Sequence, residues 1–207
     1  MSPPPAEPTG FRHLGDTTRY QGWRIVLVEA AFEAPDGTGF VRDVVRHPGA
    51  VAVVPVTGHG TVLLVRQYRG PVDAELLEIP AGTRDVEGEP PEETARRELA
   101  EEVGVRATEL RLLVEMLNTP GFCDERTHLY LATGLEPCPT DRSGVEEHHM
   151  EVVEVPFGEI DAMVADGRLV DGQTILGLVL ARDLLARETV AAVPGRSGSG
   201  EGVSGAC

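Results

Sequence analysis

The chain has 207 residues, of which 41% are hydrophobic and 25% charged, a composition typical of a globular protein with one well-buried domain. Acidic residues number 34 against 18 basic ones, and the net charge of −16 would repel a phosphate backbone, which argues against nucleic acid as a partner. If the ligand is itself a phosphate anion, the same charge calls for divalent cations to bridge protein and ligand.

No apolar run approaches the ~18 residues needed to span a membrane, so no membrane association is expected. The first nine residues are rich in proline rather than in leucine or valine, unlike a secretory signal peptide. Three cysteines, Cys123, Cys138 and Cys207, are an odd number without the spacing of a disulfide framework. A reduced cytoplasm is the simplest setting for such a chain.

A single domain is expected over residues 21–190, between two flexible ends. Residues 1–20 contain Pro-Pro-Pro, glycine and threonine without an apolar period, and residues 191–207 are rich in glycine and serine. Within the domain, residues 21–48 are expected to form N-terminal strands.

Strands are expected to dominate the first half of the domain, and helices its end. The first two strands form an antiparallel hairpin around the turn residues Pro-Asp-Gly at 35–37. Alternating or apolar runs predict strands at 23–32, 40–45, 51–56, 62–67, 76–79, 110–117, 127–133 and 152–155. A first helix is expected to begin near Pro90 and to end at Gly104, and two further helices are expected at 157–166 and 173–187. Because strands and helices mix without regular βαβ alternation, the fold class expected is α+β and sandwich-like.

The segment 82–105 carries an unusual concentration of acidic residues on an expected helix. Glu98 and Glu102 are four residues apart, so they share one helix face with a rise of roughly 6 Å between them, and Glu101 lies beside them. Arg97 can neutralise one of these carboxylates, and hydrated Mg²⁺ or Mn²⁺ would account for the rest. An isolated Arg-Glu-x-x-Glu-Glu would usually be a solvated surface helix.

A solvated surface helix does not explain the spacing of residues over the longer segment from Gly82 to Val105. Arg97-Glu98-Leu99-x-Glu101-Glu102-x-Gly104-Val105, with Glu89 eight residues before Arg97 and a glycine before that, resembles the Nudix box. One departure is that Gly82 lies seven residues before Glu89, where this family usually has six; an inserted loop residue is the simplest explanation. The resemblance implies a Nudix-type α/β/α sandwich with a mixed β-sheet and the N-terminal antiparallel hairpin.

The resemblance is strongest to the ADP-ribose pyrophosphatase branch of the Nudix hydrolases. The branch markers are Glu78-Ile79-Pro80-Ala81-Gly82, Gln67-Tyr68-Arg69, and Pro120-Gly121, which lies 15 residues after Val105. They imply hydrolysis of ADP-ribose to AMP and ribose 5-phosphate by attack of a metal-activated water. Mg²⁺ or Mn²⁺ would be bound by Glu98, Glu102 and the backbone carbonyl of Ala81, with Glu101 assisting. The substrate-binding residues expected are Trp23, Phe40, Arg46, Arg69, Gly82 and Pro120.

A general base in this branch normally comes from a mobile loop before the last strand. Here that loop is 141–150, which offers Glu146 and Glu147, and Glu146 is the preferred of the two. With Glu101 and Arg97 they complete the expected catalytic set. The neighbouring His148 and His149 are interpreted as surface loop residues rather than metal ligands.

The branch also implies a homodimer in which N-terminal strands complete the partner's adenine site. Trp23, at the start of its strand, is the better candidate for stacking on adenine, whereas core packing is as good an explanation for Phe40. Other nucleotide sugars, such as ADP-glucose or GDP-mannose, remain open as substrates. A non-catalytic, ligand-sensing Nudix domain is a further alternative, but the box glutamates are complete and no basic winged-helix segment is attached.

Overall fold

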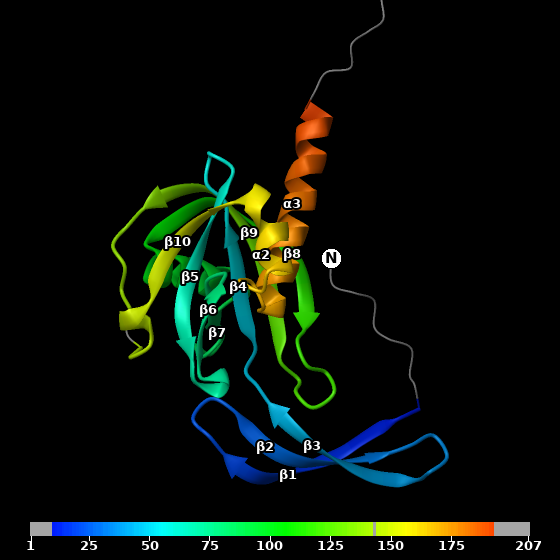
Figure 1. Cartoon of the computed structure of the whole chain (residues 1–207). Helices are drawn as coiled ribbons and strands as arrows, with labels where there is room; N and C mark the ends of the chain where they lie inside the picture. Colours follow the sequence, from blue (N-terminus) through cyan, green and yellow to red (C-terminus); the bar gives the residue numbers. More distant parts are fainter. Residues whose placement is uncertain (1–9, 143, 193–207) are drawn as a thin grey trace, which may run out of the picture.

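The structure, a computed structural model, describes residues 10–142 and 144–192. Its elements are β1 (Arg12–Gln21), β2 (Val26–Glu33), β3 (Gly39–Arg46), β4 (Ala50–Pro55), β5 (Thr61–Arg69), β6 (Ala74–Glu78), β7 (Ala81–Thr83), α1 (Pro91–Glu98), β8 (Val105–Leu117), β9 (Arg126–Pro137), β10 (Glu151–Pro156), α2 (Ile160–Ala165) and α3 (Gly172–Ala192). A further helical turn, η2 (Leu99–Val103), continues α1, and short 3-10 turns include η1 (Gly70–Val72) and η3 (Glu147–His149). Figure 1 shows their arrangement.

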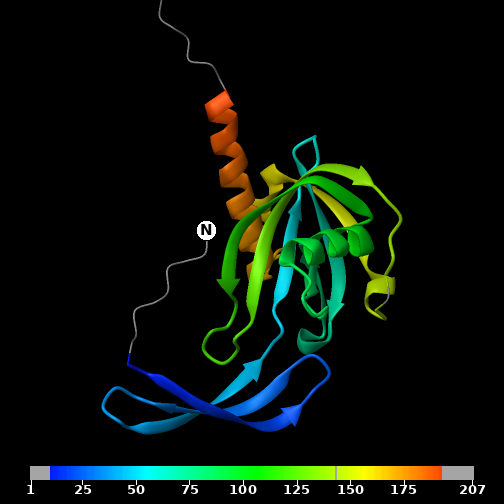
Figure 2. The same ribbon diagram turned by 180° about the vertical axis from the view of Figure 1, so that it is seen from behind.

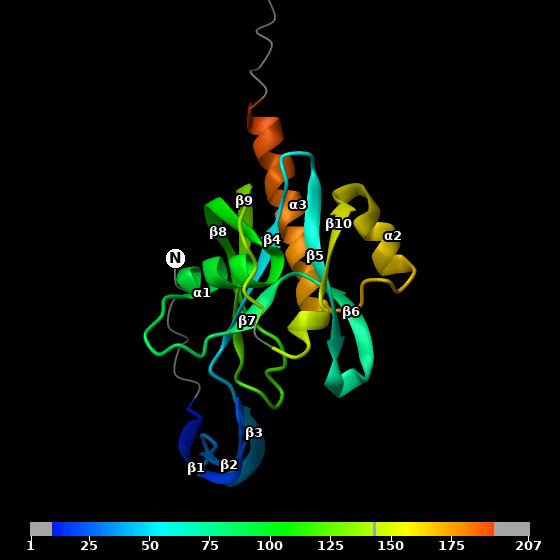
Figure 3. The ribbon, with the colours of Figure 1, turned by 90° about the vertical axis from the view of Figure 1, so that its left-hand side faces the viewer.

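Three sheets make up the strand layer and its N-terminal extension. Their strand orders are β1-β2-β3, β10-β5-β6 and β7-β4-β9-β8. All paired strands are antiparallel except β4 and β9, which run parallel. The β1-β2-β3 sheet lies at one end of the molecule, away from the helices, as Figures 1 and 3 show.

The central strand β4 is buried on both faces, and its alternating side chains enter two different cores. Val51 and Val53 pack with α1 and η2, whereas Ala52 and Val54 pack with α2 and α3. Figure 1 views the sheets from the side of α3, and Figure 2 from the side of α1. A strand layer covered by helices on both faces is the α/β/α sandwich that the sequence predicted, and the class is α+β.

The N-terminal strands differ from the prediction in two ways. Residues 12–20, expected to be poorly ordered, form most of β1, and β2 begins at Val26 rather than at Trp23. The result is a three-stranded sheet instead of a hairpin. Every residue of β1 is exposed. Because neither face of this strand is covered in one chain, its sequence has no apolar alternation by which it could be recognised.

The ends of the chain are only partly described. Residues 1–9 and 193–207 lie outside the described residues, so the flexibility expected there is not tested. The last helix, α3, extends beyond the sheets in Figure 1. In the part of the chain that the structure describes, no helix is long and apolar enough to cross a membrane.

Candidate active site

The acidic helix is positioned by signals at both of its ends. Pro90 precedes the helix in an extended conformation, and Pro91 is its first residue, where a missing N–H costs nothing. Its end is Gly104, which has a φ of 73°, and a Cβ there would press against Thr140 and the carbonyl of Cys138. Ala95, Leu99 and Val103 are buried in the core beneath it, as predicted. Because this apolar face is fixed in the core, the position of the helix face that carries the glutamates is fixed as well.

The turn that carries the last two box glutamates is wider than an α-helix. Leu99–Val103 forms a π-helical turn, a feature that is rare and frequently found at functional sites. It contains Glu101 and Glu102. The sequence predicted a regular α-helix here, because nothing in the pattern of apolar residues marks a single π turn.

Two of the glutamates are buried rather than solvated. Glu98 is 8% exposed and Glu102 4%. The backbone N–H of Ala81, in β7, donates to Glu102 Oε2 over 3.1 Å. Glu98 lies against Gly82, where a Cβ would overlap the Glu98 carboxylate. Gly82 was predicted to bind substrate; what the structure shows is that its missing side chain makes room for Glu98.

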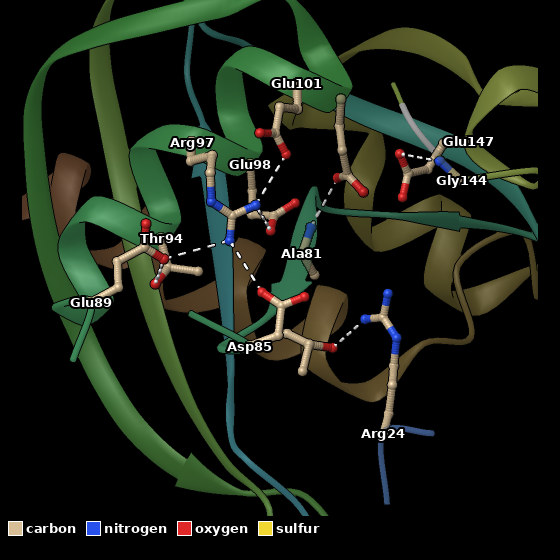
Figure 4. Close-up of polar contacts among 12 residues, drawn as sticks. Arg24, Ala81, Asp85, Glu89, Thr94, Arg97, Glu98, Glu101, Gly144 and Glu147 are labelled. Carbon is tan, nitrogen blue, oxygen red and sulfur yellow. Dashed lines mark hydrogen bonds and ion pairs between the residues drawn. The ribbon is translucent and has the colours of Figure 1, made fainter. Parts of the chain in front are cut away.

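Arg97 is the cation at the centre of this acidic cluster. Its Nη1 lies 2.9 Å from Glu98 Oε1 and 3.1 Å from Glu101 Oε2. Its Nη2 lies 3.5 Å from a Glu89 oxygen and 3.7 Å from an Asp85 oxygen. Figure 4 shows the guanidinium between these carboxylates. Arg97 was expected among the catalytic residues, and its guanidinium pairs with the carboxylates of the acidic helix itself.

Burial dominates the ionisation of the two inner glutamates. Loss of hydration raises the pKa of Glu98 to about 7, although Arg97 opposes the rise. Burial likewise raises the pKa of Glu102 to about 8, and the negative charge of Glu98 adds to the effect. Near neutral pH these two side chains therefore need a positive partner before both can ionise.

These residues fit a divalent cation that keeps part of its water. Within the described residues, no three His, Cys, Asp or Glu side chains come together as a complete metal shell. Mg²⁺, however, commonly uses one or two carboxylates and fills its other positions with water and substrate phosphate. Glu98 and Glu102 supply two adjacent, poorly hydrated carboxylates of this kind. This donor set fits a divalent cation that prefers oxygen ligands, as Mg²⁺ and Mn²⁺ do.

The glutamates line a cavity of about 500 Å³. Its walls come from the β1–β2 turn that carries Trp23, the loop before β4 and the start of β4, the end of β5 with the η1 turn, β7 with the loop after it, the acidic helix, the β8–β9 loop, the loop before β10 and the start of α3. The charged and polar members are Arg24, His47, Gln67, Tyr68, Arg69, Thr83, Asp85, Arg97, Glu98, Glu101, Glu102, Glu125, Glu146, Glu147 and Gln173. A cavity of this size, lined by both acidic and basic side chains, suits a ligand that carries both metal-binding phosphates and further polar groups.

Arg69 reaches this cavity already oriented by a buried carboxylate. Its Nη2 lies 2.6 Å from Glu78 Oε2, and its Nε is 3.0 Å from both Glu78 oxygens. Gln67 donates to the same carboxylate over 2.9 Å. Glu78 is 4% exposed, so the pair is firmly held. These contacts use Nε and Nη2, so among the described residues Nη1 is the guanidinium nitrogen that remains for a ligand.

The two glutamates in the loop before β10 differ in their burial. Glu147 is half-buried and accepts a hydrogen bond from the Gly144 N–H over 3.1 Å (Figure 4). Its negative charge contributes to the raised pKa of both Glu98 and Glu102. Glu146 also lines the cavity but is exposed, and His148 and His149 are exposed and lie outside it.

The remaining expected substrate residues are divided between cavity and surface. Trp23 lines the cavity with 92% of its surface exposed, and the Arg24 guanidinium lies 4.7 Å from its ring centre. Phe40 does not line the cavity; it stacks on Phe32 with ring centres 5.4 Å apart. Arg46 binds two aspartates outside the cavity, and Pro120 is exposed on the β8–β9 loop.

Several cavity residues had no signal in the sequence. Arg24, which donates to the Thr83 hydroxyl over 2.8 Å, follows Trp23, but nothing in its local pattern points to the β7 loop. His47, Glu125 and Gln173 come from three segments that are far apart in the chain. Only the folding of these segments around β4 brings them together.

The overlap at Gly82 leads to a prediction about metal binding. Gly82→Ala should weaken Mn²⁺ binding by about 10- to 100-fold, because the new methyl group must displace the Glu98 carboxylate. Gly58→Ala is a matched control, since a Cβ at Gly58 meets nothing within 4 Å. Titration of Mn²⁺ followed by electron paramagnetic resonance measures the change. Equal affinities for the two variants would contradict the proposed fit.

The raised pKa values predict how the metal-free protein responds to pH. Both groups titrate near 4.5 when unfolded and higher when folded, so their stabilising effect is complete at low pH and is lost as the pH rises through about 7 and 8. The free energy of unfolding in chelator should therefore fall between pH 6 and pH 9, by about 1 kcal/mol or more from this pair.

Glu102→Gln should reduce that fall, because the amide cannot ionise. Urea unfolding of both proteins at several pH values provides the measurement, and the comparison removes the contribution of other titrating groups. If the variant loses stability with pH as steeply as the parent protein, the ionisation of Glu102 does not cause the fall in stability.

Comparison with known proteins places this geometry in a family. The NUDIX domain family matches residues 46–175. An ADP-ribose pyrophosphatase of Mycobacterium tuberculosis is 39% identical over 160 residues, 77% of each chain. One of Bacillus subtilis is 41% identical over 136 residues, covering 66% of this chain and 73% of the relative. A GDP-mannose pyrophosphatase of Yersinia enterocolitica is 40% identical, covering 60% of this chain and 68% of the relative.

A solved structure agrees on the fold. A crystal structure of an ADP compounds hydrolase superposes with a TM-score of 0.75 at 22% identity, covering 86% of this chain and 95% of the other. The matched residues 46–175 include the acidic helix, both buried glutamates, Arg69 and the loop before β10. The chain therefore belongs to the Nudix hydrolase family, in the branch that contains the ADP-ribose pyrophosphatases.

Proposed function

We propose that this protein hydrolyses ADP-ribose to AMP and ribose 5-phosphate in a reaction that depends on Mg²⁺ or Mn²⁺. The observation that carries the proposal is one cavity with the buried Glu98–Glu102 pair, the oriented Arg69 and the exposed ring of Trp23. Each of these features matches one part of a nucleoside diphosphate sugar: the metal-bound diphosphate, a phosphate oxygen that accepts a hydrogen bond, and a flat base. The names of the relatives support the same substrate class.

The metal site is proposed at Glu98 and Glu102, with Glu101 and the backbone carbonyl of Ala81 as further ligands. A bound divalent cation supplies a lower pKa for the attacking water and stabilises negative charge on phosphate oxygens. Arg97 holds Glu98 and Glu101 in place from the other side. Gly82 keeps the space that the Glu98 carboxylate needs.

Substrate orientation is assigned to Arg69 and Trp23. Arg69 presents Nη1 to the diphosphate, and because Glu78 fixes the guanidinium, little side-chain freedom is lost on binding. Arg24 covers one face of the Trp23 indole ring, which leaves the other face for adenine. Phe40, stacked within the N-terminal sheet, and Pro120, on the surface, have no direct contact assigned to them.

The proton from the attacking water is assigned to Glu147. Of the two loop glutamates it is the more buried, and it is the one whose charge acts on Glu98 and Glu102. The sequence analysis preferred Glu146, although the sequence did not define the register of the loop. A general base must lie within reach of the attacking water, and Glu147 lines the cavity that holds Glu98 and Glu102.

The assembly proposed is a homodimer in a reducing cytoplasm. Large apolar side chains are exposed on the N-terminal sheet and its turn, among them Phe11, Tyr20, Ile25 and Val41. A second copy covering this surface would bury them, and the free thiols of Cys123 and Cys138 suit a reducing compartment. Sedimentation velocity at the assay concentration distinguishes dimer from monomer.

The substrate assignment is tested with a panel of ADP-ribose, ADP-glucose and GDP-mannose in Mg²⁺. ADP-ribose should have the highest kcat/KM, with AMP and ribose 5-phosphate as products, and excess chelator should abolish turnover. Higher kcat/KM for GDP-mannose would transfer the proposal to that nucleotide sugar. A protein that binds these compounds without cleaving any of them would be a ligand-sensing Nudix domain.

The base is tested by replacing each loop glutamate separately. Glu147→Gln should lower kcat by about 100-fold or more with little change in KM, because a base acts in the transition state. Glu146→Gln is the matched control and should stay near the parental kcat. The reverse pattern would assign the role to Glu146, and parental rates in the double variant would exclude this loop.

A further inference from the structure

Arg46 joins three segments of the chain that are far apart in sequence. Its Nε and Nη2 contact Asp16 of β1 in a bidentate pair, at 2.9 and 3.0 Å. Its Nη1 donates to Asp124 Oδ2, in the loop 118–125, over 3.0 Å. Arg46 is itself the last residue of β3. We call Arg46, Asp16 and Asp124 the Arg46 clamp.

Backbone hydrogen bonds run beside the clamp along the same seam. The Val45 N–H donates to the Phe122 carbonyl over 2.8 Å, and the Asp124 N–H donates to the Val45 carbonyl over 3.2 Å. The second carboxylate oxygen of Asp124 accepts from the His47 N–H over 2.9 Å. Asp124 therefore holds the end of β3 through its backbone and its side chain. This seam connects the N-terminal sheet with the β8–β9 loop.

The clamp is better formed than an ordinary surface ion pair. The side chains of Arg46 and Asp16 are 31% and 29% exposed, and the contact is bidentate. Hydrogen bonds from Arg46, opposed by partial burial and helped by His13, lower the pKa of Asp16. Within β1, His13 Nε2 also lies 2.6 Å from Asp16 Oδ1. Among the described residues, the other ion pairs that join β1 to another strand, Arg12–Glu33 and Arg19–Glu29, connect it only to β2.

The position of the N-terminal sheet determines where Trp23 lies. β1 and β2 are joined by the turn that carries Trp23 and Arg24, and Asp16 is in the strand that leads into it. At the cavity rim this turn is held by the Arg24–Thr83 hydrogen bond. Arg46 itself is not among the residues that line the cavity. The clamp and the Arg24 contact are therefore two anchors of one sheet.

We infer that Arg46 is a positioning residue, which fixes the N-terminal sheet against the loop 118–125 and thereby holds Trp23 at the cavity. The inference deepens the proposed function, because it rests on Trp23 contacting the substrate. It replaces the direct substrate contact that the sequence suggested for Arg46. Since the clamp does not touch the acidic helix, its loss should affect substrate binding more than the chemical step.

The clamp can be tested without substrate because Trp23 is the only tryptophan in the chain. Asp16→Asn, Asp124→Asn and Arg46→Lys should each lower the fluorescence anisotropy of Trp23, since the sheet that carries it becomes more mobile. Arg12→Gln is the matched control: it breaks an ion pair inside the same sheet and should leave the anisotropy unchanged. Circular dichroism shows whether each variant is folded. Parental anisotropy in a folded Asp16→Asn protein would overturn the clamp.

Kinetics on ADP-ribose separate positioning from direct contact. The Asp16→Asn and Asp124→Asn variants should raise KM by roughly three- to tenfold with kcat within about twofold, matching Arg46→Lys. If Arg46→Lys alone raises KM, Arg46 contacts the substrate directly and the positioning role is wrong. If the parent protein does not hydrolyse ADP-ribose at all, the proposed function fails, while the anisotropy measurement still decides the clamp.

Discussion

The burial of two carboxylates on one helix is the constraint on which the rest of this site depends. Glu98 and Glu102 lie against the β7 loop because Ala95, Leu99 and Val103 fix the opposite face of the helix in the core. Desolvation and mutual repulsion make this arrangement costly without a cation. The fold thus keeps a site that favours binding a divalent ion, at the expense of its stability when the ion is absent.

The neighbouring groups are arranged to make that burial possible. Arg97 supplies a permanent positive charge, the Ala81 N–H supplies a hydrogen bond, and Gly82 supplies space. Arg69 shows the same arrangement with opposite charges: here the group that faces the cavity is positive, and the buried carboxylate of Glu78 holds it. In both cases a charged group that must meet substrate or metal is oriented in advance by an opposite charge, so little reorganisation is needed on binding.

The cavity is lined by two parts of the molecule that are stabilised in different ways, one by an apolar core and the other mainly by polar contacts. The sandwich has a core on each side of β4, whereas β1 is exposed along its whole length in a single chain. The N-terminal sheet is connected to the sandwich by the Arg46 clamp, the seam at Val45 and the Arg24–Thr83 contact. A sheet held by a few polar contacts can move more easily than the metal site, which suits the part of a cavity that must admit a large ligand.

Local patterns in the sequence determined the acidic helix, its two ends, most strands of the sandwich, and the glutamates with Arg97 beside them. The short strand β7 was not predicted. These features depend on residues within a turn or two of one another, so spacing alone reveals them. The tertiary structure alone decided that β1 is a strand, that Glu147 rather than Glu146 is the more buried, and that Arg46 meets Asp16 and Asp124. Such contacts join segments up to 108 residues apart in the numbering (16 to 124), and no local period or spacing encodes them.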